Sequence, residues 1–289
     1  MTQTVIKWAT GLLALFLIGP LASVPLSNLR LPEGSTAATA LWSTAPAAGL
    51  LGVVIVLVVA LVYGLVALRV AGGPTAVLAM GMILGWGAYR MPVVEEALRR
   101  TVATGSSPSA LLWSQAVEGA IVGALLIAVA AIFEAAHARL ASTHEGSPAW
   151  IRKELLSKEG LIGIAVAMVL AGVAAGIVAF DSARGQALAA GWLGAIAAGA
   201  AARLTHASAG HRFPILGPVA GIALAGVIVP IVAAIMHGAR VGELAYAQQL
   251  FAPARLTPLD WAAGAMLGVP TGIAWAGGMI EKRSAQPAA

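Results

Sequence analysis

Long apolar runs alternate with short polar segments along the whole chain. Apolar stretches cover residues 5–24, 48–70, 73–89, 110–136, 160–181, 185–204, 213–237 and 260–280. Each is close to the ~20 residues that an α-helix needs to cross a bilayer. Helices are expected because they satisfy their own backbone hydrogen bonds in lipid. The pattern predicts an all-α integral membrane protein, a polytopic bundle of about eight transmembrane helices.

Composition strengthens this prediction and narrows the chemistry. Of 289 residues, 60% are hydrophobic and 10% are charged, whereas a soluble domain carries about 25% charged residues. The chain has no cysteine, which excludes disulfides, thiolate metal sites and a cysteine nucleophile. No motif predicts a cofactor or a metal, and no basic run predicts nucleic-acid binding. The expected partners are the lipid bilayer and other membrane subunits or a second copy.

The two halves of the chain are similar in pattern. GGPTAVLAMG at 72–81 resembles LGPVAGIALAG at 216–226, and each span is followed by an amphipathic connector, then a proline and a tryptophan-marked span. Four spans per half is an even number, so this pattern predicts two parallel four-helix halves. The predicted units are a first half over 1–140, a cytoplasmic connector over 141–159 and a second half over 160–289.

Short amphipathic segments predict interfacial helices. In RMPVVEEALRR (90–100), Val93, Val94, Ala97 and Leu98 fall on one helical side, with Glu95, Glu96, Arg99 and Arg100 largely on the other. We therefore expect the charged side to face water. A second interfacial helix is expected within 148–159.

Topology follows from the basic residues. With the N-terminus inside, ten of the 17 Lys and Arg residues fall on the cytoplasmic side and seven on the other. This bias predicts a multi-pass protein of the cell membrane with both termini in the cytoplasm. Trp113 and Trp261 lie near span ends, where indoles anchor helices at the interface.

Small residues recur at the four-residue spacing that lets helices approach closely. Gly119 and Gly123 form one such pair, and Gly264, Gly268 and Gly272 form a three-step run. Membrane helices pack through such residues, so the run is expected to mark a tight helix–helix or subunit contact.

Glu118 is the acidic residue that lies well inside a predicted span, within one helical turn of Ser114 and Gln115. An ionisable group at this depth favours a proton or cation site. The alternative is a hydrogen-bonded residue that faces the bundle. Near the end of the fifth span, Asp181 and Arg184 are expected to form a local ion pair or to cap the next helix.

The stretch PVVEEALRR raises an enzymatic alternative. Its Pro92, Glu95, Glu96 and Arg100 resemble the first motif of the CPBP intramembrane proteases, and FEAAH resembles their Phe-x-x-x-His motif. The family's last motif would use His237, although Val241 departs from its pattern. The resemblance implies that Glu95 activates water, assisted by His137 and His237. The ~26 helical residues before His137 would place it roughly 39 Å from Glu95, so the depth of these groups tests the idea.

These patterns favour a non-catalytic membrane subunit or scaffold that packs through small-residue faces. A transport path needs polar lining, and an enzyme needs converging groups. The alternatives are a transporter or channel for small solutes or ions that uses Glu118, and the protease.

Overall fold

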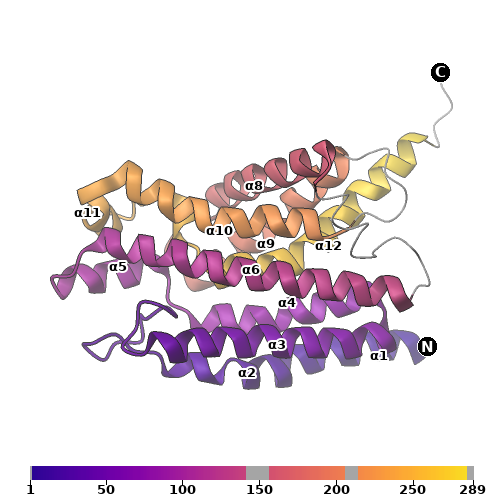
Figure 1. Ribbon diagram of the computed structural model, residues 1–289, viewed down its shortest axis with the longest axis horizontal. Coiled ribbons are helices and arrows are strands. Elements are labelled where there is room, and N and C mark those ends of the chain that lie inside the picture. The colour runs from indigo at the N-terminus through magenta and orange to yellow at the C-terminus, as the bar shows by residue number, and fades with distance from the viewer. Residues whose placement is uncertain (1, 141–155, 206–213, 285–289) are drawn as a thin grey trace.

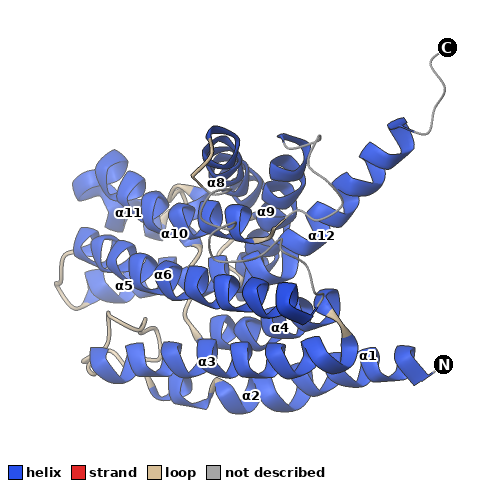
Figure 2. Cartoon of the chain, turned by 45° about the vertical axis from the view of Figure 1, so that its right-hand side comes forward, coloured by secondary structure: helices blue, strands red, loops and turns tan. Residues whose placement is uncertain are grey.

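The computed structural model describes residues 2–140, 156–205 and 214–284. The predicted interfacial helix within 148–159 lies largely outside these residues. Within the described residues every regular element is helical (Figure 2). Eight helices in this part of the chain are long and apolar enough to cross a membrane. The prediction of an all-α chain with about eight helices able to cross a membrane is confirmed.

The helices follow the predicted spans closely. In the first half they are α1 (Thr2–Leu13), the π-helix η1 (Ala14–Ile18), α2 (Gly19–Ala22), the 3-10 helix η2 (Val24–Asn28), α3 (Pro46–Ala71), α4 (Gly73–Arg90), α5 (Val94–Ala103) and α6 (Pro108–Leu140). In the second half they are α8 (Lys158–Val178), α9 (Arg184–Thr205), α10 (Leu216–His237), η3 (Gly238–Arg240), α11 (Val241–Tyr246), η4 (Ala252–Arg255) and α12 (Pro258–Ser284).

The long helices lie side by side as one bundle (Figure 1). Helix α4 packs on α12, and α10 packs on α6, so the third long helix of each half contacts the fourth of the other half. The short connectors α5 and α11 also contact each other. Helix α1 begins and α12 ends at the same end of the bundle.

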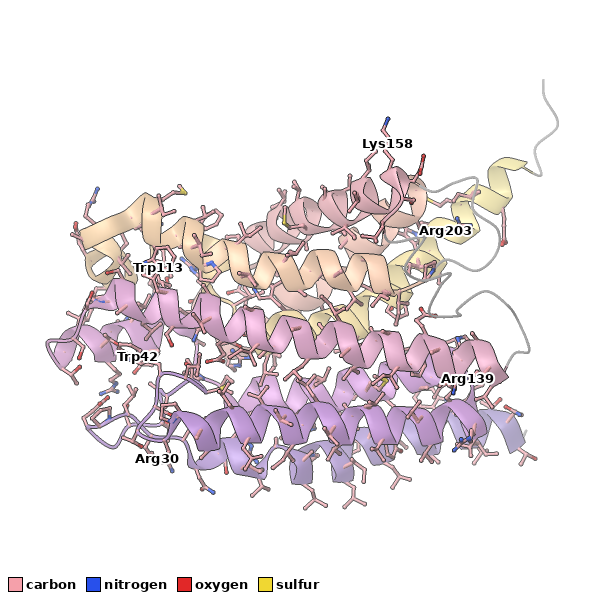
Figure 3. All side chains as sticks on the ribbon, viewed as in Figure 1. Arg30, Trp42, Trp113, Arg139, Lys158 and Arg203 are labelled. Carbon is pink, nitrogen blue, oxygen red and sulfur yellow. The ribbon has the colours of Figure 1, made fainter. Side chains whose placement is uncertain are left out.

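The two ends of the bundle differ in the residues they carry. Arg30, Trp42 and Trp113 lie at the end that holds α5 and α11, which we call the α5 end (Figure 3). Arg139, Lys158 and Arg203 lie at the opposite end, which we call the terminal end. This arrangement decides which of the candidate groups can meet.

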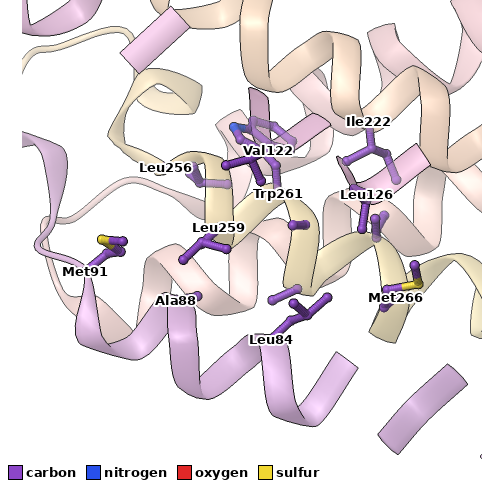
Figure 4. Packing of buried hydrophobic residues seen from close by; sticks show 14 of the residues in the cluster. Leu84, Ala88, Met91, Val122, Leu126, Ile222, Leu256, Leu259, Trp261 and Met266 are labelled. Atoms are coloured by element: carbon purple, nitrogen blue, oxygen red, sulfur yellow. The ribbon is translucent and has the colours of Figure 1, made fainter. Parts of the chain in front are cut away.

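Trp261 does not anchor the chain at an interface, contrary to the expectation from its place in the sequence. Its side chain is 2% exposed and belongs to the apolar core (Figure 4). Leu256 and Leu259 belong to the same core, and Gly226 of α10 packs against the indole. The indole is covered by α6 and α10, since Gly119, Val122 and Gly226 line the same small cavity as Trp261. Trp113, by contrast, is 48% exposed.

Candidate functional site

Two ion pairs are buried at the α5 end, and they form the most polar part of the interior. One joins Glu95 of α5 to Arg255 at the end of η4, and the other joins Arg184 at the start of α9 to Asp260 in the first turn of α12. The side chains of Glu95 and Asp260 are both 0% exposed, and Arg255 is 4% exposed. Buried charges are stable in a protein when they are paired, so these contacts determine the local structure.

Glu95 lies between two arginines. Nε of Arg255 is 3.1 Å from its Oε1, and Nη2 of Arg99 is 3.8 Å from its Oε2. Neither N–H is aligned for a hydrogen bond, so the contacts are charge pairs. The prediction that Glu95 lies on the wet face of an amphipathic helix is therefore wrong. Arg255, which is distant in sequence, neutralises the carboxylate and allows α5 to bury it.

The two arginines also tie the connectors together. Arg255 donates hydrogen bonds to the carbonyl oxygens of Ala179 (2.9 Å) and Gln248 (2.6 Å). Arg99 donates to the carbonyl of Ala245 at 3.0 Å, and the hydroxyl of Tyr246 donates to the carbonyl of Arg99 at 3.2 Å. The Glu95 cluster thus links α5, α11, η4 and the end of α8.

The second buried pair is formed by Arg184 and Asp260. The guanidinium binds both carboxylate oxygens, and Arg184 also lies 3.4 Å from the carbonyl oxygen of Pro92. Asp260 caps the start of α12, since its Oδ2 accepts hydrogen bonds from the backbone N–H and the hydroxyl of Thr257, both at 2.8 Å. The expected local pair of Asp181 with Arg184 is wrong, because α12 supplies the carboxylate. Asp181 instead accepts from the N–H of Ser182.

Glu118 is held by the segment that precedes α3. Its Oε2 accepts the backbone N–H of Leu41 at 3.0 Å, and the side chain is 0% exposed. The segment is itself anchored, because Trp42 donates its indole N–H to the hydroxyl of Thr101 at 3.2 Å. Glu118 is therefore hydrogen-bonded to a loop that folds into the α5 end of the bundle.

Part of this polar site is unsatisfied. The side chain of Thr39 and the backbone of Ala40 also lie against the Glu118 carboxyl, but Oε1 accepts no well-aligned hydrogen bond. Both amide atoms of Gln115 are buried without a hydrogen bond among the described residues. Gln115 is 2% exposed, whereas Ser114 is partly exposed. Buried polar atoms of this kind usually bind water or an ion. The Gln115–Glu118 face of α6 is thus a candidate solute or proton site.

The residues of the protease-like motifs do not converge. Glu96 forms a half-exposed pair with Arg100 (2.9 Å). His237 accepts the N–H of Phe251 at the α5 end. His137 packs near Phe133 and Gly73 at the terminal end, close to the end of the 33-residue helix α6. Glu95 instead lies beside Arg255 at the α5 end, so much of the length of α6 separates it from His137.

The glycine run of α12 lies against α9. A Cβ added to Gly264 would overlap the backbone of Gly191, and one added to Gly268 or Gly272 would overlap the carbonyl of Trp192 or Ile196. Gly119 similarly lies against the backbone of Gly226 in α10. Beside Gly123, an added Cβ would lie 3.1 Å from Ala223. These contacts hold α12 on α9 and α6 on α10 at backbone distance.

The sequence did not predict the buried pairs of Arg255 with Glu95 and of Arg184 with Asp260, or the hydrogen bonds of Thr257 to Asp260. One feature of the sequence pointed to buried pairing: Arg255 and Asp260 flank Pro258 at the start of an apolar span, where charged groups must find partners or water. Within the described residues, no group of three or more His, Cys, Asp or Glu side chains could hold a metal ion.

The described residues form an all-helical bundle with eight helices able to cross a membrane and with buried ion pairs at one end. Comparison with protein family models, with curated proteins and with solved structures finds no match.

Proposed function

We propose that this protein is a non-catalytic integral membrane subunit or scaffold of a larger membrane assembly. The observation that carries the proposal is the burial and charge pairing of Glu95, the acidic residue that best resembles a catalytic carboxylate. It is fully buried between Arg255 and Arg99, which join separate connectors. A carboxylate in this setting stabilises structure and is poorly placed to activate water.

The outer faces of the bundle support the same proposal. Helix α8 carries exposed apolar side chains along its length, including Ile162, Val169, Val173 and Ile177. Such a face suits lipid or a neighbouring transmembrane helix. The reciprocal packing of α4 on α12 and of α10 on α6 favours two parallel four-helix halves, over 1–140 and 160–289. The bias of basic residues favours a cell-membrane protein with cytoplasmic termini.

We expect the protein to leave the membrane as a stoichiometric complex with another membrane protein or with itself. The test is chemical cross-linking in intact membranes, followed by gentle-detergent purification and native mass spectrometry. Cross-linking before solubilisation guards against loss of a weak partner. A lone 29.0 kDa chain in both measurements would contradict the subunit proposal.

A second candidate function is transport of a small solute or ion through the Gln115–Glu118 face. The buried amide of Gln115, which has no hydrogen-bond partner among the described residues, favours it together with the buried carboxyl of Glu118 on the same helical face. Glu118→Gln removes the charge but keeps the size of the side chain, so it is expected to abolish flux through such a path. The measurement is solute or proton uptake in proteoliposomes, with Glu96→Gln at the bundle surface as the matched control. Equal flux in the wild type and in Glu118→Gln would eliminate this path.

A further inference from the structure

An apolar groove of about 350 Å³ opens between the two halves near the α5 end. Its walls come from η1, α4, α9 and α12, and they include Leu15, Met82, Gly85, Trp86, Leu188 and Leu267. Gly85 keeps the groove open, because a Cβ added there would meet no atom within 4 Å. The groove therefore has room for an apolar chain.

A π-helical turn builds one wall of this groove. In η1 the N–H of Gly19 donates to the carbonyl of Ala14, five residues back. The same spacing would pair the carbonyl of Leu15 with residue 20, but Pro20 has no N–H. The indole N–H of Trp86 donates to Leu15 instead, at 2.6 Å. Trp86 is thereby fixed as a wall of the groove.

Arg90 lies at the mouth of the groove. Its guanidinium carbon is 6.0 Å from the ring centroid of Trp86, and its Nε is 3.5 Å from the hydroxyl of Ser23. The side chain is exposed and forms no ion pair among the described residues. Five other arginines at this end have carboxylate partners: Arg99, Arg100, Arg184, Arg240 and Arg255. Arg30, also at this end, donates instead to the backbone carbonyls of Ser27 and Leu29. Arg90 is thus a cation available to an anionic group.

We propose that the groove binds one acyl chain of a phospholipid while Arg90 binds the lipid phosphate. Tyr89 lies seven positions after Met82, about 10 Å further along α4. An acyl chain in the groove would therefore run inward from the end of the bundle where Arg90 lies. Tyr89 lines the outer part of the groove and is 54% exposed. A guanidinium presents several N–H donors to phosphate oxygens, and the apolar walls exclude water from the chain. The pairing of a cation with an apolar groove selects an amphiphile over a second protein helix.

The test is lipid titration of the delipidated full-length protein, read by native mass spectrometry. The probes are dioleoyl-phosphatidylglycerol and dioleoylglycerol, which share acyl chains but differ in the phosphate. The wild type is expected to retain one phosphatidylglycerol and to bind it more tightly than dioleoylglycerol. Gly85→Leu fills the groove and is expected to weaken binding of both lipids by about tenfold. The matched control is Gly172→Leu, since an added Cβ on this α8 residue also meets no atom within 4 Å.

Arg90→Gln is expected to remove the preference for phosphatidylglycerol while dioleoylglycerol binding stays unchanged. Arg69→Gln, at an exposed position on α3, is its control. The proposal would be overturned if Arg90→Gln and Arg69→Gln bound phosphatidylglycerol equally tightly. It would also be overturned if the wild type were a dimer, and Gly85→Leu dissociated that dimer without changing lipid binding. If Gly85→Leu fails to fold, the Arg90→Gln comparison still decides, because Arg90 is exposed and unpaired.

Discussion

Gly268→Leu is expected to lower the free energy of unfolding by about 3 kcal/mol or more, since overpacking a close contact forces the backbone apart. A Cβ at this position would overlap the carbonyl of Trp192 and lie 2.8 Å from the backbone N of Ile196. These atoms belong to α9 and cannot move aside as the end of a flexible side chain would. Unfolding in denaturant, followed by tryptophan fluorescence of the detergent-solubilised protein, measures the change.

The same helix offers a matched control for this substitution. Gly277 also lies in α12, but a Cβ added there meets no atom within 4 Å. Gly277→Leu is therefore expected to change the free energy of unfolding by no more than about 0.5 kcal/mol. If both variants unfold at the same denaturant concentration as the wild type, the backbone contact between α9 and α12 is not a source of stability.

Glu95→Gln is expected to destabilise the protein by about 3–5 kcal/mol, because it leaves a buried arginine without its counter-charge. Arg255 is 4% exposed and has no route to solvent without disrupting η4. Its hydrogen bonds to Ala179 and Gln248 remain, so the loss reports the missing charge. The readout is again the midpoint of denaturant unfolding, together with the yield of monodisperse protein.

The adjacent residue provides the contrast. Glu96 pairs with Arg100 at the surface, with side chains 43% and 52% exposed, respectively, and an exposed pair contributes about 0–1 kcal/mol. Glu96→Gln should therefore be nearly neutral. In addition, Glu95→Leu combined with Arg255→Met should be more stable than either single variant, since no fully buried charge remains unpaired; Arg99 also loses its partner, but its side chain is 24% exposed. Equal effects at positions 95 and 96 would refute the buried-pair explanation.

Features that depend on local pattern were predictable from the sequence. The apolar spans were predictable, because the length of an apolar stretch determines whether a helix can cross a membrane. The predicted stretches 48–70 and 260–280 correspond to α3 (Pro46–Ala71) and α12 (Pro258–Ser284). The glycine spacing in α12 is also local, and the run lies against α9.

The charged sites were not predictable, because each depends on a partner that is remote in the sequence. The helical pattern of 90–100 places Glu95 beside Glu96 and carries no information about Arg255. In the same way, Arg184 has a nearby acidic residue, Asp181, but pairs with Asp260 on the adjacent helix α12, which is remote in sequence. The loop that binds Glu118 has no periodic pattern, so its fold into the bundle was not foreseen. These contacts follow from the topology of the helices.

The buried pair of Glu95 with Arg255 also constrains how the chain is assembled at the ribosome. Glu118 follows its partner Leu41 in the sequence, so its hydrogen bond is available as soon as α6 enters the membrane. Glu95 precedes Arg255 by about 160 residues. At roughly 5–20 residues per second, Arg255 is synthesised about 8–30 s later. During that interval Arg99, whose side chain is 24% exposed, is the arginine beside Glu95, so the carboxylate has only the longer of its two charge contacts. A chain truncated before residue 255 would keep this incomplete arrangement, and α5 would lack the ion pair that joins it to η4.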